Sequence, residues 1–240
     1  KIFTWDDQLA DGDKFVKINF PNPLSVVDVP SFQQRDRFCC LIAGNKALAV
    51  LSSDDLYQER IRAIRWFEVH APDDFDLYGM GWNLPAFKRG GLHKLHRFLY
   101  QHLQYVLNLH PFPSYRGAIV SKASVLRRTK FSVCYENVGG LSGYITEKIF
   151  DCFLSGCIPV YWGASNVVDH IPADCFVDRR QFSCIADVYK YLKSMPLSEY
   201  EQYQVNIRQF LVSDNAKSFG HDEFASIIVQ TILSEFKLEK

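Results

Sequence analysis

The chain has 240 residues, of which 48% are hydrophobic and 15% aromatic, so it can bury a sizeable core as one large domain or two small ones. Lysine plus arginine and aspartate plus glutamate each number 27, and this balance excludes a global attraction to nucleic acid or to an anionic membrane. Any site for an anionic ligand is therefore expected to be local.

Seven cysteines, an odd number without a CxxC pair, are typical of reduced thiols rather than of a disulfide framework. Cys39 and Cys40 are adjacent, and the other five lie in apolar segments. We therefore expect buried, reduced thiols, which modestly favours a cytosolic protein.

The first expected elements are two strands, one long helix and a third strand. KFVKIN at 14–19 is a short strand candidate, and FCCLIAGN at 38–45 is nearly all apolar, as expected of a strand covered on both faces. Asp54 and Asp55 then open the helix DLYQERIRAIRWFEVH, whose apolar positions recur at helical spacing. FDLYG at 75–79 is the next strand.

The rest of the chain alternates helices with strands. The expected elements are, in chain order, a helix rich in His and Tyr between Trp82 and Pro113, a short basic helix near 121–129, the strand FSVCYEN, the helix TEKIFDCFLSG, the strand IPVYWG, a short helix near 164–170, the strand CFVD at 175–178, and helices near 184–195, 197–213 and 221–237. This alternation implies an α/β fold, a doubly wound parallel sheet with helices on both faces. In such sheets ligands bind outside the carboxyl ends of the strands.

A glycine-rich turn between FSVCYEN and TEKIF brings Asn137 and Tyr144 to the start of a helix. A helix start collects free backbone N–H groups and the positive end of the helix dipole, so it suits an anion. Thr146 is the candidate N-cap, and Glu147 is either a simple partner of the dipole or a functional residue. Lys148 opposes the dipole, and a diphosphate would explain its position.

The glycines of this turn are either ordinary loop residues or positions where the backbone approaches a ligand closely. Gly139, Gly140 and Gly143 lie within five residues of one another, which favours close approach to a ligand. Their spacing matches neither a Rossmann GxGxxG motif nor a Walker loop.

Three arginines in ERIRAIR would ordinarily form a solvated helix face. Arg60, however, shares a stripe with the apolar positions of its helix and is expected to point nearer the interior than Arg62. A partly buried arginine needs an anion, and bidentate contact with phosphate is its preferred use.

Metal and serine-hydrolase chemistry are not expected. His93 and His96 are three residues apart on a predicted helix and can in principle share a metal. No acidic ligand or HExxH pattern accompanies them, so a solvated or packed helix face is favoured. No GxSxG elbow is present in the sequence.

Taken together, FSVCYEN…GYITEKIFD…GCIPVYWGA…CFVDRRQF resembles the signature region of the α-1,3/1,4-fucosyltransferases, glycosyltransferase family ten. LYQERIRAIRWFE…FDLYGMGW and the opening KIFTWDDQLADGDKFVKINFPNP extend the resemblance over nearly the whole chain, most specifically over 130–163. The resemblance implies a GT-B architecture of two Rossmann-like domains, with this chain as the carboxyl-terminal half. Residues 1–30 would then be a lead-in from a missing amino-terminal acceptor domain, and 31–240 the GDP-fucose-binding domain.

The resemblance also implies roles for individual residues. Glu147 would bind the ribose hydroxyls, Lys148 and Arg60 would neutralise the diphosphate, and Asn137 and Tyr144 would line the fucose and phosphate side of the pocket. The implied reaction is the inverting transfer of fucose from GDP-fucose to a hydroxyl of an oligosaccharide or glycoconjugate, with no cofactor required. The catalytic base is expected in the missing acceptor domain, so no residue of this chain receives that role.

Two alternatives stay open. The first is a transferase of another sugar specificity on the same scaffold, because diphosphate contacts do not select fucose. The second is a non-catalytic module that binds a GDP-sugar. The expected location depends on the source: cytoplasmic or peripheral at the inner membrane in a bacterium, and Golgi in a eukaryote.

Overall fold

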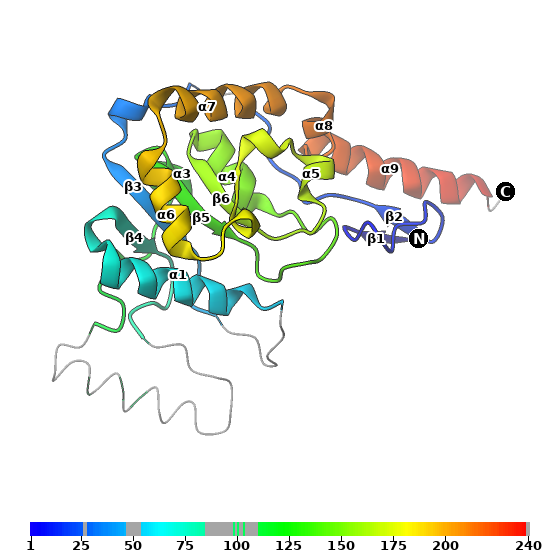
Figure 1. The fold of residues 1–240 in the computed structure, drawn as a ribbon. Helices are drawn as coiled ribbons and strands as arrows, with labels where there is room; N and C mark the ends of the chain where they lie inside the picture. Colours follow the sequence, from blue (N-terminus) through cyan, green and yellow to red (C-terminus); the bar gives the residue numbers. More distant parts are fainter. Residues whose placement is uncertain are drawn as a thin grey trace.

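The central feature of the computed structural model, which describes residues 1–25, 28–46, 54–84, 98, 100, 103 and 110–238, is a parallel sheet of five strands (Figure 1). The strands are β3 (Arg37–Ile42), β4 (Phe75–Tyr78), β5 (Thr129–Tyr135), β6 (Ile158–Trp162) and β7 (Val177–Asp178). Their spatial order is β4-β3-β5-β6-β7, so the chain runs outward from β3 to β4 and then crosses back to β5. The neighbours β3 and β5 therefore form the topological switch point of the sheet.

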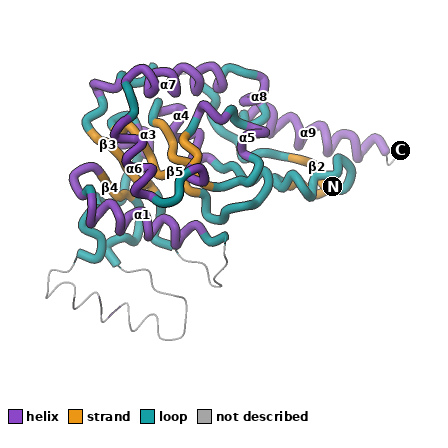
Figure 2. Tube along the Cα trace, viewed as in Figure 1, coloured by secondary structure: helices purple, strands orange, loops and turns teal. Residues whose placement is uncertain are grey.

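Helices cover both faces of this sheet (Figure 2). In the described ranges they are α1 (Leu56–His70), α3 (Lys122–Leu126), α4 (Glu147–Ser155), α5 (Val167–His170), α6 (Ile185–Ser194), α7 (Leu197–Leu211), α8 (Asp214–Lys217) and α9 (His221–Leu238). Side chains of α1 and α6 share one hydrophobic cluster with the sheet, and side chains of α3, α4 and α5 share another. The predicted doubly wound α/β fold is confirmed.

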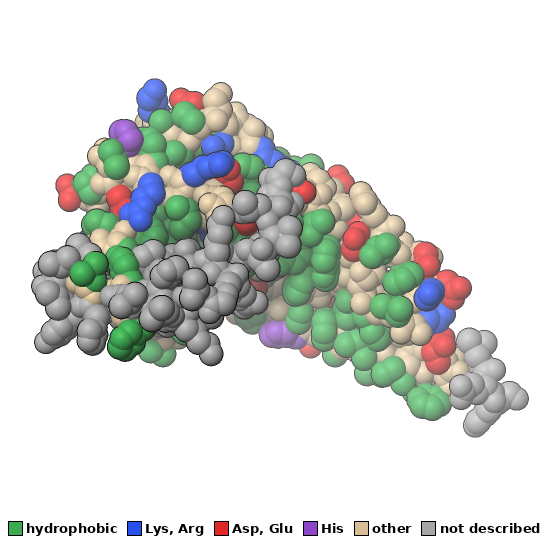
Figure 3. All heavy atoms as spheres, turned by 90° about the horizontal axis from the view of Figure 1, so that it is seen from below, with side chains coloured by type: hydrophobic (Ala, Val, Ile, Leu, Met, Phe, Trp, Pro, Cys, Tyr) green, Lys and Arg blue, Asp and Glu red, His purple; other side chains and the backbone are tan. Residues whose placement is uncertain are grey.

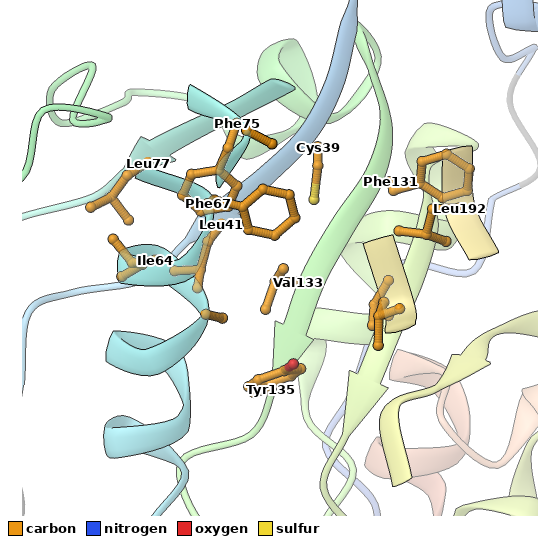
Figure 4. Close-up of a cluster of buried hydrophobic side chains, with 14 of the residues drawn as sticks. Cys39, Leu41, Ile64, Phe67, Phe75, Leu77, Phe131, Val133, Tyr135 and Leu192 are labelled. Atoms are coloured by element: carbon orange, nitrogen blue, oxygen red, sulfur yellow. The ribbon is translucent and has the colours of Figure 1, made fainter. Parts of the chain in front are cut away.

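The packing of strand β3 on both of its faces explains why its sequence is almost entirely apolar. Successive side chains of a strand point to opposite faces, so Cys39 joins the cluster under α1 while Cys40 joins the cluster under α4. On the first face, Phe67 of α1 stacks on Phe75 of β4, with ring centroids 4.6 Å apart (Figure 4). On the other face, the ring of Phe150 in α4 lies 5.0 Å from that of Phe219.

The long helix α1 begins where the sequence predicts. The carboxylate of Asp55 accepts a hydrogen bond of 2.8 Å from the backbone N–H of Tyr57 and so caps the helix. Helix α4 ends at Gly156, whose φ of 65° is left-handed. A Cβ at Gly156 would lie 2.6 Å from the guanidinium of Arg35, so glycine is needed there for both reasons.

The first residues form a separate two-stranded parallel sheet of β1 (Ile2–Thr4) and β2 (Phe15–Lys17). Strand β2 is predicted by the sequence, whereas β1 is not, because three residues are too few to show a period. This sheet lies beside α9, where Lys1 Nζ is 3.5 Å from Glu235 Oε1. No helix in the described ranges is long and apolar enough to cross a membrane.

Helix α9 and the first residues project together from the rest of the molecule, and hydrophobic side chains gather along this projection (Figure 3). The large apolar side chains of α9 that are exposed are Val229, Ile232, Leu233 and Phe236. They recur at helical spacing, so they form one stripe on the surface of the helix.

The cysteines are free thiols, and six of the seven are buried as predicted. The expectation is wrong for Cys184, which is exposed. It directly precedes α6, and its Sγ lies 3.3 Å from the carboxylate of Asp187 at the solvent-facing start of that helix. Burial raises the pKa of the Cys40 thiol to about 12, so this thiol is held in its unreactive form.

The helix predicted between Trp82 and Pro113 falls mostly outside the described residues, as do His93 and His96. Among the residues that the structure describes, no group of three or more His, Cys, Asp or Glu side chains is placed to hold a metal ion.

Candidate functional site

A pocket opens at the switch point, at the carboxyl-terminal halves of β3 and β5. Five elements, β3, α1, α3, β5 and α4, contribute side chains to it in addition to the loop after β3. The lining residues are Leu41, Ile42, Ala43, Arg60, Lys122, Leu126, Ser132, Val133, Cys134, Tyr135, Lys148, Asp151 and Cys152. This is the edge at which the parallel-sheet pattern predicts a ligand site.

Arg60 reaches this pocket from α1 and is buried, with 3% of its surface exposed. Its Nη2 donates to the backbone carbonyl of Tyr135 at 2.6 Å and to Asn137 Oδ1 at 3.0 Å. Burial lowers the pKa of the guanidinium, but an arginine stays charged in proteins. No salt bridge joins Arg60 to a carboxylate within the described ranges. Its hydrogen bonds go to neutral oxygens, its guanidinium lies 4.8 Å from the centroid of the Tyr57 ring, and Glu136 acts on it only at longer range.

The contrast with Arg62 is as predicted from the helical spacing. The side chain of Arg62 is 73% exposed and pairs with Glu59 on the solvent face of α1. A buried guanidinium without a carboxylate is costly, and an anionic ligand would offset that cost.

Asn137 and Tyr144 lie next to Arg60 rather than in the wall of the pocket. Asn137 receives the hydrogen bond from Arg60, and its side chain lies near the hydroxyl of Tyr144. The pKa of Tyr144 is raised, first by burial and then by the nearby carboxylate of Glu136. These three predicted residues thus lie together beside the pocket.

Lys148 lines the pocket from the first turn of α4 but is not unpaired. Its Nζ lies 2.8 Å from Glu136 Oε2 and 2.8 Å from Thr146 Oγ1. An ammonium group has three N–H donors, so one remains for a ligand in the pocket. Thr146 is the N-cap residue, as predicted, but its side chain does not cap the helix. Its hydroxyl donates to the carboxylate of Glu136 instead, at 2.8 Å to Oε2.

Glu147 is the most exposed of the predicted site residues. Its Oε1 accepts a hydrogen bond of 3.2 Å from Lys122, which also donates to Asp151 Oδ2 at 2.7 Å. Although burial raises the pKa of Glu147, the charges of Lys148 and Lys122 outweigh it, and the net shift is downward. Glu147 is therefore a carboxylate at neutral pH and can accept hydrogen bonds from hydroxyl groups.

The structure gives Gly143 a role different from the predicted close approach to a ligand. Its φ of 76° is left-handed, and a Cβ there would lie 2.4 Å from the carbonyl oxygen of Trp5 and 2.7 Å from Asp7 Oδ2. The close approach is thus to the chain's own first residues. The sequence could not show this, because the partners are more than 130 positions away.

Sequence reasoning also missed Glu136, Lys122 and Asp151. Glu136 directly follows β5 and is fully buried, which a residue next to a turn does not suggest. One signal was available for Asp151: it follows Glu147 by four residues, so both carboxylates lie on one face of α4. Two carboxylates on one helix face predict a cation between them, and Lys122 of α3 is that cation.

A parallel α/β domain with a pocket at its switch point belongs to the class of doubly wound folds, and its buried arginine and helix-start lysine lie where such folds place their ligands. The chain belongs to glycosyltransferase family 10. The model of that family, described as "Glycosyltransferase family 10 (fucosyltransferase) C-term", matches residues 93–221, more than half of the chain.

Individual relatives agree with this assignment. The chain is 36% identical over 75 residues to "Alpha-(1,3)-fucosyltransferase FucT" of Helicobacter pylori, and this match covers 31% of this chain and 16% of the relative. It is 33% identical over 92 residues to "Alpha-(1,4)-fucosyltransferase" of Arabidopsis thaliana, covering 37% and 22%. It is 29% identical over 148 residues to "4-galactosyl-N-acetylglucosaminide 3-alpha-L-fucosyltransferase 9" of Mus musculus, covering 53% and 40%.

Solved structures are more distant. The chain is 18% identical to "Crystal Structure of alpha1,3-Fucosyltransferase with GDP", at a TM-score of 0.48 over 89% of this chain and 48% of that one. The GDP-fucose complex of an α1,3-fucosyltransferase gives 16% identity and a TM-score of 0.42, over 95% of this chain and 73% of that one. The chain thus matches less than half the length of each curated relative named above.

Proposed function

We propose that this chain is the donor-binding part of an inverting fucosyltransferase, in which GDP-fucose supplies the fucose and a glycan hydroxyl accepts it. The observation that carries the proposal is the buried guanidinium of Arg60, which lines the switch-point pocket without a carboxylate partner in the described ranges. A diphosphate fits this position, because its oxygens supply the anion that the guanidinium lacks. Membership of a family whose model is described as fucosyltransferase supports GDP-fucose as the donor.

In the proposed complex, Arg60 and Lys148 contact the diphosphate from two sides. Negative charge develops on the GDP leaving group as the bond between fucose and phosphate breaks. Two cations that are already held in place stabilise this charge without further reorganisation. Arg60 is held by Tyr135 and Asn137, and Lys148 is held by Glu136.

Glu147 is proposed to accept hydrogen bonds from the ribose hydroxyls, since its charged carboxylate lies at the start of α4 and is half exposed. Asn137 and Tyr144 are proposed to contact the fucose and phosphate side of the donor. Before a ligand arrives, Asn137 is held by its hydrogen bond from Arg60, and Tyr144 is held by ring contacts with Trp5 and Phe20. Such preorganisation reduces the entropy lost on binding.

In this proposal the chain is part of a longer protein of GT-B architecture. The catalytic base belongs to the amino-terminal acceptor domain of that protein. The base removes the proton of the acceptor hydroxyl while the oxygen attacks the anomeric carbon from the face opposite GDP. The acceptor class is a glycan or glycoconjugate. The division into a lead-in of 1–30 and a donor domain of 31–240 is part of this proposal.

The test is a transfer assay on the full-length protein with GDP-fucose and an N-acetyllactosamine acceptor, followed by NMR of the product. We expect release of GDP and an α-linked fucose, the inverted configuration of the β-linked donor. Transfer of another sugar from its own nucleotide, with no transfer of fucose, would favour a different specificity. Saturable binding of GDP-fucose without transfer to any glycan would favour a non-catalytic module.

A further inference from the structure

Asp7, in the segment between β1 and β2, lies at the centre of a polar cluster that reaches the glycine-rich turn. Its Oδ1 is 2.5 Å from Lys17 Nζ, and its Oδ2 is 2.8 Å from Asn166 Nδ2 and 2.7 Å from His170 Nε2. Both carboxylate oxygens are thus engaged, and each of these side chains is partly shielded from water. These contacts join the first residues of the chain to α5.

The same cluster binds the backbone of the glycine-rich turn directly. Asn166 Oδ1 accepts a hydrogen bond of 2.8 Å from the N–H of Gly143, and the N–H of Asp7 donates to the carbonyl of Ser142 at 3.3 Å. Gly143 packs so closely against Asp7 and Trp5 that a Cβ has no room. The turn is therefore fastened from both sides, by Asn166 and by Asp7.

The residue after Gly143 is Tyr144, and its ring lies against two aromatic rings of the first residues. The centroid of Tyr144 is 4.8 Å from that of Trp5 and 5.9 Å from that of Phe20. Its hydroxyl lies near Asn137, which accepts the hydrogen bond from Arg60. A continuous series of contacts therefore runs from Asp7 to the arginine of the pocket.

We infer that Asp7 is a positioning residue for donor binding: together with Asn166, it holds the glycine-rich turn so that Tyr144 and Asn137 are ready for the ligand. The inference rests on the proposed function, because GDP binding is one of its readouts. Without the cluster, the turn would sample other conformations, and GDP would bind only the fraction of molecules with the turn in place. Neither Asp7 nor Asn166 needs to contact the ligand for this effect.

The test compares Asp7→Asn, Asn166→Ala and the double variant with the unchanged chain, by calorimetric titration with GDP. Asp7→Asn keeps the size of the side chain but removes its charge, and Asn166→Ala removes the acceptor for the Gly143 N–H. Asp13→Asn is the matched control, because Asp13 lies in the same lead-in but pairs with Lys1 at the surface. Hydrogen exchange of the backbone amides of 142–145 is measured in parallel.

We expect each single change to weaken GDP binding about three- to tenfold, the range given by the loss of one or two hydrogen bonds. The double variant should be no weaker than the weaker of the two single variants, because both act through one cluster. Exchange of the 142–145 amides should rise while exchange in β5 and β6 stays slow. Asp13→Asn should change neither measurement.

Unchanged GDP affinity in both single variants, or additive losses in the double variant, would overturn the inference. So would faster exchange throughout the sheet, because that result indicates general destabilisation rather than a local role. If the unchanged chain does not bind GDP, the proposed function fails instead. The exchange measurement then still decides whether Asp7 holds the turn: slow exchange at 142–145 in the variants would refute it.

Discussion

The ammonium group of Lys148 lies 2.8 Å from Oε2 of Glu136, a carboxylate with no solvent exposure. The pair joins the end of β5 to the first turn of α4, and Thr146 completes it with hydrogen bonds to the same carboxylate. The position of Lys148 is therefore fixed by a buried partner. A cation fixed in this way is suited to a defined ligand oxygen, whereas a free surface lysine is not.

Glu136→Gln should lower the free energy of unfolding by about 2–4 kcal/mol, somewhat less than the full cost of breaking a buried ion pair. We expect less than the full cost because Lys148, left without its partner, is still partly hydrated: 19% of its side chain is exposed. Urea denaturation at pH 7 measures this change. A variant as stable as the unchanged chain would show that the pair does not hold β5 and α4 together.

Arg60→Ala should weaken GDP binding by about 10- to 100-fold, the range expected for loss of charge-assisted hydrogen bonds. The substitution also leaves the carbonyl of Tyr135 without its buried donor, so a loss of stability of about 1–3 kcal/mol is expected. Calorimetry well below the unfolding temperature separates the two effects.

The matched control is Arg62→Ala, on the solvent face of the same helix. The Arg62 side chain is 73% exposed, and its partner Glu59 is partly exposed, so both GDP affinity and stability should stay within about 0.5 kcal/mol of the original. Equal effects of the two substitutions would argue against a diphosphate contact at Arg60.

Acid should abolish the contribution of Asp7 to stability. Although burial opposes it, hydrogen bonds from Asn166, Lys17 and His170 lower the pKa of Asp7 from 3.8 to about 2. A carboxylate whose pKa is lower in the folded state stabilises the fold above its unfolded pKa, and this stability is lost as pH falls toward the folded pKa. The shift corresponds to about 2 kcal/mol at neutral pH.

The measurement is the difference in unfolding free energy between the unchanged chain and Asp7→Asn. We expect a difference near 2 kcal/mol at pH 6 that shrinks steadily from pH 4 to pH 3. A difference independent of pH would mean that the charge of Asp7 is not what stabilises the fold.

A chelator should leave GDP affinity unchanged. The proposed diphosphate contacts come from Arg60, Lys148 and the start of α4, so no divalent ion is needed to balance the charge. Titration with GDP before and after dialysis against EDTA tests this. Loss of GDP binding that a divalent metal restores would favour a metal site at His93 and His96.

Much of the fold could be predicted from the sequence because its elements carry strong local signals. The stripe of Leu56, Ala63, Ile64 and Phe67 recurs at helical spacing, and all four side chains are buried in α1. β3 is continuously apolar because it is covered on both faces. These signals depend only on neighbouring residues, so a single sequence is enough to show them.

The contacts of the site were less predictable because they join distant parts of the chain. Asp7 and His170 are 163 positions apart, and nothing near either residue indicates the other. Glu136 could not be recognised as buried from its neighbours in sequence, because the cation that balances its charge, Lys148, lies on another element. The five predicted site residues do lie together at one edge of the sheet, but their pairing depends on the tertiary structure.

We propose that the switch-point pocket binds the GDP moiety of a nucleotide-sugar. Calorimetric titration of this chain with GDP-fucose, with GDP-mannose and UDP-glucose as comparisons, measures this binding. We expect saturable binding of GDP-fucose that weakens at least tenfold in Lys148→Ala, with UDP-glucose bound more weakly. Absence of saturable binding of either GDP-sugar, or equal affinity in Lys148→Ala, would contradict it.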